Sequence, residues 1–227
     1  YTAFVNNGTV KLQDNGLSIL TRLVVNGTVD YSGTGNFSNT NNLQNRLVGA
    51  DASATLNNAT DIELNVGQLL IEDITVNNQA KIVADKTTES TVNLRIDNSV
   101  INNLAPMSGL QALNGASIEL GTGIINGGFV TSSNGGSFKV LGDSAWNGVE
   151  LTTGSDVFVL NNNSVTLSNS FVNNGQISLQ DNGLSIITAL HVDGSVDYSG
   201  SGVINANNNA QNRLAGIDAN SVLHNMT

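Results

Sequence analysis

One stretch of this chain occurs twice, and that repetition constrains the fold more than any other feature of the sequence. Residues Phe4–Asn58 return as Phe171–Asn225 without a gap, at an offset of 167 positions (171 − 4), and about 60% of the paired residues are identical. Self-similarity at a fixed period is typical of repeat architectures. The chain therefore holds one long repeat, residues 4–170, and a partial second copy, residues 171–227, which indicates a segment of a larger array.

A shorter pattern runs inside the long repeat. It consists of Asn or Asp, then Gly or another small residue, then alternating apolar and polar positions, as in Asn7–Leu12 and Asn114–Leu120. Successive Asn residues of this kind, such as Asn114 and Asn134, mostly lie about 20 residues apart. That period is too short for a helix pair or a propeller blade and fits one coil of a β-solenoid. With strands stacked about 4.8 Å apart, a long repeat would hold about eight coils and extend roughly 40 Å.

The parity of the apolar residues supports stacked strands. In this interpretation Ile118 and Leu120 point into the core while Glu119 points outward, and one coil later Phe138 points inward and Lys139 outward. Charged residues repeatedly occupy outward positions, as expected when one face of every strand is buried. Asn-Gly and Asp-Gly steps favour positive φ angles and would form the corners, where stacked Asn side chains can build hydrogen-bonded ladders. Asn, Gly, Ser and Thr are poor helix formers, so we expect an all-β fold.

Two places interrupt the short period. The step from Asn26 to Asn58 is 32 residues (58 − 26), which leaves about a dozen extra residues for a long loop. We therefore expect an inserted loop over Gly33–Asp51 and, in the second copy, over Gly200–Asp218. A coil looks shortened around Leu104–Gly109, where the single proline falls. No Pro-rich or charge-rich linker is visible, so the whole chain is predicted to form one continuous solenoid segment.

Composition and charge exclude several partners. The net charge is −10, with eight Lys and Arg spread singly, so there is no basic patch for nucleic acid or for an anionic membrane surface. No apolar run approaches the length that crosses a bilayer, so we expect no membrane insertion of this segment. Cysteine is absent. A cysteine-free chain suits a bacterial cell-surface protein that is exported unfolded, whereas a small secreted eukaryotic domain usually carries disulfides.

The sequence predicts no enzyme and no catalytic residue. Polysaccharide hydrolysis or lyase chemistry needs clustered carboxylates, or calcium with a basic partner. Here the acidic residues are scattered, and the one adjacent pair of glutamate and aspartate, Glu72 and Asp73, would point to opposite faces of a strand. His191 and His224 are replaced by a valine and an asparagine in the first copy, which makes them poor candidates for a catalytic base.

Metal and cofactor sites are likewise not indicated by any motif. There is no cluster of Cys and His with the spacing of a zinc site, and the two common calcium-loop patterns are absent. We therefore expect no cofactor and no dedicated metal site. A single Ca²⁺ ion at a corner such as Asp14-Asn15-Gly16 is the one alternative that the sequence leaves open.

The repeated loop is the best candidate for contact with a partner. Both copies keep the segment Gln-Asn-Arg-Leu, while the Asn-rich residues before it vary. One interpretation is structural: Arg46 pairs with Asp51, or caps the loop against the neighbouring coil. The other is that the loops display a contact surface at regular spacing along the rod. The candidate residues of that surface are Asn41, Asn42, Gln44, Asn45, Arg46, Asn208, Asn209, Gln211, Asn212 and Arg213.

The coil pattern resembles that of a family of large exported adhesins of Gram-negative bacteria. The features that carry the resemblance are coils such as Asn7–Leu12 and Asn174–Leu179, their regular spacing along the chain, and the lack of cysteine. In these features the chain is similar to filamentous-haemagglutinin-like proteins of two-partner secretion and to autotransporter passenger domains. The resemblance implies a right-handed, single-stranded parallel β-helix, export to the cell surface, and adhesion or biofilm scaffolding. It implies no catalytic residues.

These observations lead to four functional hypotheses. The first is a non-catalytic shaft of a secreted or outer-membrane-associated bacterial adhesin or filament, whose partners are the neighbouring repeats of the same polypeptide. The second is a module whose side loops bind extracellular polysaccharide, or a host or bacterial surface. The third, disfavoured by the scattered carboxylates, is a polysaccharide lyase or hydrolase. The fourth is end-to-end self-association, because a cut solenoid exposes unpaired strand edges.

Overall fold

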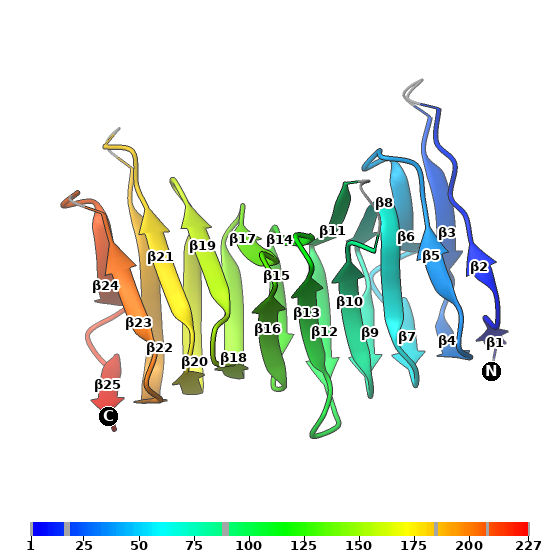
Figure 1. Ribbon diagram of the computed structural model, residues 1–227. Helices are drawn as coiled ribbons and strands as arrows, with labels where there is room; N and C mark the ends of the chain where they lie inside the picture. The colour runs from blue at the N-terminus through cyan, green and yellow to red at the C-terminus, as the bar shows by residue number, and fades with distance from the viewer. Residues whose placement is uncertain (1, 16–18, 88–90, 184–185, 208, 227) are drawn as a thin grey trace.

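The chain folds as a β-solenoid of about nine turns. The computed structural model describes residues 2–15, 19–87, 91–183, 186–207 and 209–226. Among these residues there is no helix, and every strand pairing is parallel. Figure 1 shows the strands stacked side by side from β1 at one end of a rod to β25 at the other. The predicted all-β solenoid is therefore confirmed.

The strands form three long faces, because each coil contributes one strand or part of a strand to each face. Face 1 consists of β1 (Thr2–Val5), β4 (Thr28–Ser32), β7 (Thr55–Asn58), β9 (Thr75–Asn78), β12 (Ser99–Asn103), β15 (Gly123–Asn126), the first parts of β18 (Ser144–Leu151), β20 (Ser164–Asn173) and β22 (Thr188–Ser199), and β24 (Asn212–Gly216).

The other two faces follow in the same order along each coil. Face 2 consists of β2 (Thr9–Val10), β5 (Asn36–Ser38), the first part of β8 (Ile62–Glu72), β10 (Lys81–Asp85), β13 (Gly109–Leu113), β16 (Phe129–Ser133), the second parts of β18, β20 and β22, and β25 (Val222–Asn225). Face 3 consists of β3 (Thr21–Val25), β6 (Asn45–Gly49), the last part of β8, β11 (Val92–Asp97), β14 (Ser117–Leu120), β17 (Ser137–Val140), β19 (Asp156–Leu160), β21 (Gln176–Gln180) and β23 (Val203–Ala206).

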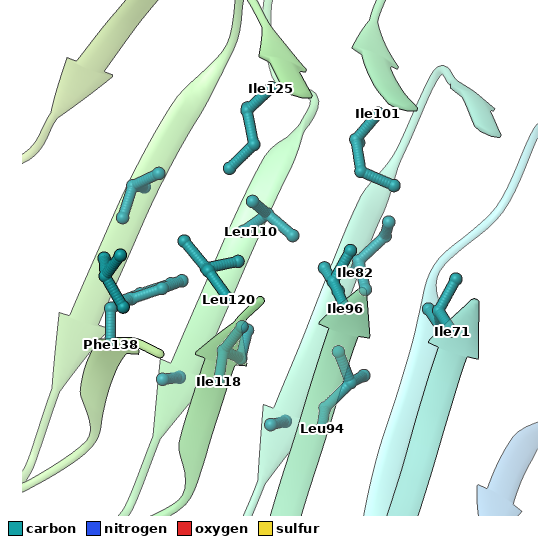
Figure 2. Close-up of a cluster of buried hydrophobic side chains, with 14 of the residues drawn as sticks. Ile71, Ile82, Leu94, Ile96, Ile101, Leu110, Ile118, Leu120, Ile125 and Phe138 are labelled. Carbon is teal, nitrogen blue, oxygen red and sulfur yellow. The ribbon is translucent and has the colours of Figure 1, made fainter. Parts of the chain in front are cut away.

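The core is built from inward columns of aliphatic side chains, one column set per face (Figure 2). On face 3, Leu94, Ile118 and Phe138 lie directly above one another in the strand register and are fully buried. Their neighbours Glu119 and Lys139 point away from the core and pair in register on the outside. The predicted inward and outward parity is therefore confirmed, and it explains why no single strand could be stable without the coils beside it.

The coils are longer and less uniform than the sequence period predicted. One turn takes 19 residues (157 − 138) from Phe138 to Val157, whereas another takes 28 residues (109 − 81) from Lys81 to Gly109. The prediction relied on the distances between Asn-Gly corners, and those corners do not mark the same point of every coil. The Leu104–Gly109 segment, for which we predicted a shortened coil, instead forms the turn between β12 and β13 that projects from one edge in Figure 1.

The long repeat does not contain a whole number of turns. Phe4 lies in β1 on face 1, but its twin Phe171 lies in the second part of β20 on face 2. Likewise β2 is on face 2, whereas its twin β21 is on face 3. The 167-residue repeat (171 − 4) thus spans seven turns and one further face, not the expected eight coils. The second copy of the repeat therefore starts one face later than the first.

Each predicted inserted loop contains two strands. Segment 33–51 contains β5 and β6, which pair with strands of both neighbouring coils, and Phe37 and Leu47 in these strands are buried in the core. Its twin, segment 200–218, contains β23 and β24. The prediction of a loop was therefore wrong at these four strands. The other described residues of the two segments, such as those between Ser38 and Asn45, lie outside the strands.

Candidate functional site

In the first copy, the residues predicted to contact a partner mostly make hydrogen bonds within the solenoid. Asn41 Oδ1 accepts a hydrogen bond from Gln68 Nε2 at 2.6 Å, and Asn42 Nδ2 donates to Asp14 Oδ1 at 2.9 Å. The backbone N–H of Gln44 donates to Asn42 Oδ1 at 2.8 Å. These amides link the turn to the coils on either side, so a partner could use them only by breaking those contacts.

Asn45 is the most strongly fixed of these residues, because its side chain is completely buried. Its amide donates to the backbone oxygens of Thr40 and Asn42, both at 3.0 Å. Its Oδ1 accepts the backbone N–H of Asp14, in the preceding coil, at 3.1 Å. The twin residue Asn212 accepts the backbone N–H of Asp181 at 3.1 Å in the same way. In both copies, the side chain of this asparagine therefore links two consecutive coils by a hydrogen bond.

Arg46 joins two coils by an ion pair with Glu72. Its predicted pairing with Asp51 is wrong, because the Asp51 carboxylate accepts hydrogen bonds from the hydroxyl and the backbone N–H of Ser53 instead. Those bonds lower the pKa of Asp51 below its usual value, with the hydroxyl bond as the largest cause. The ion pair joins Arg46 to the next coil, as expected from the other structural interpretation, in which Arg46 caps the segment against a neighbouring coil.

The second copy of the contact residues is more exposed. Arg213 is exposed, and it takes part in neither of the two ion pairs found among the described residues. Asn209 and Gln211 repeat the local contact of the first copy, with the backbone N–H of Gln211 donating to Asn209 Oδ1 at 2.9 Å. Asn208 lies outside the described residues. The nine described residues of this prediction thus lie in two segments far apart along the rod, each a turn followed by the start of a strand, and no single site unites them.

An outer asparagine ladder on face 1 is the most regular polar feature of the surface. In this ladder each side-chain amide donates to the oxygen of the preceding coil, for example Asn77 Nδ2 to Asn57 Oδ1 at 3.0 Å and Asn102 Nδ2 to Asn77 Oδ1 at 3.0 Å. Its members are Asp30, Asn57, Asn77, Asn102, Asn126, Asn147 and Asn169. The ladder is only partly buried, so it presents amide groups to solvent at the spacing of the coils.

A second, inner asparagine ladder runs through the corner that follows face 1. Asn58 Nδ2 donates to Asn78 Oδ1 at 2.7 Å, and Asn78 Nδ2 donates to Asn103 Oδ1 at 2.8 Å. Asn58 and Asn78 are completely buried. Where this column meets the first coils, Asn6 Nδ2 donates to the buried hydroxyl of Tyr31 at 3.3 Å. The predicted Asn ladders are therefore present, one outside the wall and one within it.

A third feature was missed by the sequence reasoning. His224 Nε2 lies 3.0 Å from Ser195 Oγ, on the exposed surface of face 2. A nucleophilic serine also needs a group that orients the histidine and donors for an oxyanion, and the described contacts of this pair include neither. Within the described residues there is also no group of three or more His, Cys, Asp or Glu side chains that could hold a metal ion. The signal that would have found the pair is the strand register, which sequence spacing does not reveal.

Two shallow polar grooves lie between coils of different length. One, of about 430 Å³, is lined by Ala50, Asp51, Asp73 and Asn98, and Asn98 Nδ2 donates to Asp73 Oδ1 at 2.6 Å. The other, of about 440 Å³, is lined in part by Asp61 and Glu63 and carries little apolar surface. Neither groove contains an aromatic side chain on which a sugar ring could stack.

The apolar core is open at both ends of this chain. At the end that contains β1, a cavity of about 290 Å³ is lined by core residues that include Phe4, Tyr31 and Phe37. At the end that contains β25, a cavity of about 180 Å³ is lined by Tyr198, Leu223 and further apolar residues. Both cavities are continuous with the interior columns, so they are surfaces on which another coil could stack rather than ligand pockets.

No helix among the described residues has the length and apolar character to cross a membrane. A comparison with models of protein families, with curated proteins and with solved structures found no match to this chain.

Proposed function

We propose that this chain is a non-catalytic structural rod, the shaft segment of a large secreted adhesin or filament on a bacterial surface. The observation that carries the proposal is the continuity of the stack. Each of the three faces pairs strand by strand from the first coil to the last without a break in register longer than a single bulge. Such a stack keeps its two ends at a fixed separation along its axis, and further repeats can lengthen it.

The proposed mechanism is mechanical. Interior columns and asparagine ladders tie each coil to the next, so the rod holds whatever it carries at a fixed distance from its anchor. Its partners are then the neighbouring repeats of the same polypeptide, and its role is adhesion or biofilm scaffolding at the cell surface. The fold and the absence of cysteine support this proposal.

Single-molecule force spectroscopy tests the mechanical role. When the rod is pulled from its two ends, we expect unfolding in steps of one coil, each releasing roughly 65–95 Å of chain between the shortest and the longest coil. Rupture of the whole chain in one low-force event would argue against a shaft. Release of reducing ends from bacterial or plant polysaccharides by the same protein would overturn the non-catalytic assignment.

A second candidate function is binding of an extended polysaccharide along face 1. It is favoured by the outer asparagine ladder and by the column of Thr28, Thr55 and Thr75 beside it, which is in register and points outward. A glycan array distinguishes the candidates. Specific binding that disappears in the double variant Asn57→Ala, Asn77→Ala supports polysaccharide recognition. Lack of binding to every glycan on the array supports the shaft function instead.

A further inference from the structure

A second outward column runs beside the outer asparagine ladder on face 1. Each of its members stands two positions before the ladder residue of the same strand, and the members pair in register from coil to coil. Figure 2 shows Ile125 among the buried core side chains, so its neighbour Ile124 points away from the core. The column consists of Thr55, Thr75, Val100, Ile124 and Ala145. This column and the ladder from Asn57 to Asn147 are here named the neutral stripe.

The neutral stripe carries no charged side chain over five coils, in a chain whose net charge is −10. The carboxylates closest to it along the chain, Asp73 and Asp143, are exposed at the corner that precedes face 1. Asp73 accepts a hydrogen bond from Asn98 Nδ2 at 2.6 Å, and Asp143 accepts one from Ser164 Oγ at 2.8 Å. An ionised ligand would find no opposite charge on the stripe, and an anionic one would be repelled by the corner.

Each amide in the interior of the ladder keeps unused hydrogen-bonding capacity. Asn102 Nδ2 donates to Asn77 Oδ1 at 3.0 Å, and Asn102 Oδ1 accepts from Asn126 Nδ2 at 2.8 Å. A side-chain amide has two N–H donors and two acceptor lone pairs, so one of each remains for a ligand. Hydroxyl groups also donate and accept. Because the amides recur at about 4.8 Å per coil, their row favours a linear polymer of hydroxyl-bearing units.

The column beside the ladder adds aliphatic surface to these polar groups. Ile124 is 41% exposed and lies in register between Val100 and Ala145. A sugar ring combines C–H groups on its faces with hydroxyl groups at its edge, so it can cover methyl groups and reach the amides together. A protein partner fits this surface less well, because stable protein interfaces are built on large apolar or aromatic anchors. The stripe has no side chain larger than that of Ile124 in its apolar column.

We infer that the neutral stripe binds an uncharged linear polysaccharide. Its sugar rings lie over Val100, Ile124 and Ala145, and its hydroxyl groups bond to the ladder amides. The inference rests on the second candidate function, binding of an extended polysaccharide along face 1, and it names the class of ligand. Uronate chains, sulfated chains and amino polymers are the classes that it excludes from this surface.

Isothermal titration calorimetry with two matched pairs of polymers tests the class of ligand. One pair is a neutral β-linked glucan and its carboxymethylated, anionic form. The other is an N-acetylated chito-oligosaccharide and its deacetylated, cationic form. We expect a neutral polymer to bind at least about tenfold more tightly than its charged partner. Its affinity should be equal at about 50 and about 500 mM NaCl, since no ion pair contributes to the contact.

Ile124→Asp tests whether the stripe is the binding surface, because it places a charge in the middle of the aliphatic column. The matched control is Val203→Asp, since Val203 is 52% exposed on face 3. We expect Ile124→Asp to weaken binding of the neutral polymer at least about tenfold, and Val203→Asp to change it less than about twofold. Melting curves that match the unsubstituted chain show that both variants are folded. Ile124→Lys is a second variant, and an equal loss in it shows that charge of either sign is excluded.

Three results would overturn the inference, and they separate it from the function on which it rests. A charged polymer that binds as tightly as its neutral partner, or more tightly, would retain polysaccharide binding but reject an uncharged ligand. Neutral binding that persists in Ile124→Asp and Ile124→Lys would place the site elsewhere on the rod. Lack of binding to all four polymers and to the glycan array would reject the second candidate function together with the inference.

Discussion

Asn77 and Asn78 are neighbours in the chain but belong to different ladders, so their removal should have different costs. Asn78 is completely buried, and its amide group joins Asn58, Asn103 and the backbone of Ala80. Replacing it by alanine leaves several buried polar groups without partners, and we expect a loss of about 3 kcal/mol in the free energy of unfolding. Urea unfolding followed by circular dichroism measures that loss.

Asn77→Ala is the matched control for the inner ladder. Asn77 is only partly buried, so water can replace its bonds to Asn57 and Asn102, and we expect a loss below about 1 kcal/mol. Equal losses in the two variants would mean that the ladders contribute through backbone order rather than through side-chain hydrogen bonds.

The twin arginines allow a second comparison at the residue scale. Arg46 pairs with Glu72 across two coils, and both side chains are about three-quarters buried, whereas Arg213 is exposed. We expect Arg46→Gln to lower the free energy of unfolding by about 1 kcal/mol, and Arg213→Gln to change it by less than about 0.5 kcal/mol. Thermal unfolding of both variants checks this. A larger loss for Arg213→Gln would show that the second copy makes a contact of its own.

Tyr31 predicts a dependence of stability on alkaline pH. Burial raises the pKa of Tyr31 above its usual value, and the hydrogen bond from Asn6 opposes this more weakly. The folded chain therefore holds the phenolic proton after the unfolded chain has released it. The contribution of Tyr31 to stability is present below the unfolded pKa of about 10 and is lost as the pH rises from there toward the folded pKa. Urea midpoints between pH 8 and 11.5 should fall less steeply in Tyr31→Phe, and parallel profiles would contradict the assignment.

At the scale of elements, β8 turns the corner between faces 2 and 3 without a loop, as β18, β20 and β22 do between faces 1 and 2. It pairs on face 2 through Ile62–Leu64 and on face 3 through Gly67–Glu72. The bend lies at Gly67, where φ is +79° and an added Cβ would lie 2.1 Å from the backbone oxygen of Asn39. Only glycine meets both conditions.

Gly67→Ala should therefore be strongly destabilising, by about 3 kcal/mol. Gly154→Ala separates the two causes, because Gly154 also has a positive φ, +77°, but no atom lies within 4 Å of its added Cβ. That variant should lose only about 1 kcal/mol, the conformational cost alone. Chemical unfolding of both variants provides the comparison, and similar losses would mean that the approach to Asn39 relaxes.

Strands with regular alternation could be predicted from sequence, and strands rich in asparagine could not. Ser117–Leu120 and Ser137–Val140 alternate cleanly and were recognised. β5 has three residues, Asn-Phe-Ser, and its strand character comes from pairing with β2 and β8 on either side. Isolated propensity favours a turn at such a sequence, but the neighbouring coils supply the backbone hydrogen bonds that decide its conformation. Arg46 was predicted to pair with Asp51 or to cap a neighbouring coil, and its partner Glu72 could not be named because it is 26 positions away and is set by register.

Corner chemistry was also only partly predictable. Asn114 and Asn134 adopt positive φ angles and are followed by glycines that do the same, as the Asn-Gly steps predict. Gly8 follows Asn7 in an identical step but is not among the residues with positive φ. Its backbone N–H instead donates to Asn6 Oδ1 at 3.1 Å. The same dipeptide thus forms a different corner, because a preceding asparagine supplies a competing hydrogen bond.

For the whole molecule, the sequence period and the structural period are different quantities. The spacing of Asn-Gly steps shows how often corners recur along the chain. A turn of the solenoid, in contrast, ends where a strand pairs with the strand of the preceding coil. The number of residues in one turn differs from coil to coil. The long repeat therefore contains seven turns and one face. The sequence does not reveal this offset, because a residue and its twin are identical in the sequence even where they lie on different faces of the solenoid. It becomes visible only when the registers of Phe4 and Phe171 are compared.

The offset predicts how the chain can be lengthened. Asn225 is the twin of Asn58, so a copy of Asp61–Ser170 joined after Thr227 continues the second repeat in frame. Although each appended strand would lie one face later than its original, the register of the faces is preserved, and the added residues should stack as about five further turns. We expect the maximum dimension in small-angle X-ray scattering to grow by roughly 23 Å and the melting temperature to rise, since the core cavity beside Tyr198 and Leu223 becomes covered.

One inserted residue at the junction provides the control for this extension. It shifts the parity of the first appended strand, so that the apolar side chains of that strand point to solvent and its polar ones into the core. The control chain should gain neither length as a rigid rod nor melting temperature, and its appended amides should exchange hydrogen rapidly. If the in-frame chain behaves like the control, then a copy of the repeat cannot stack one face out of phase. The one-face offset would then belong to these two copies alone and could not be the rule by which a longer rod is built.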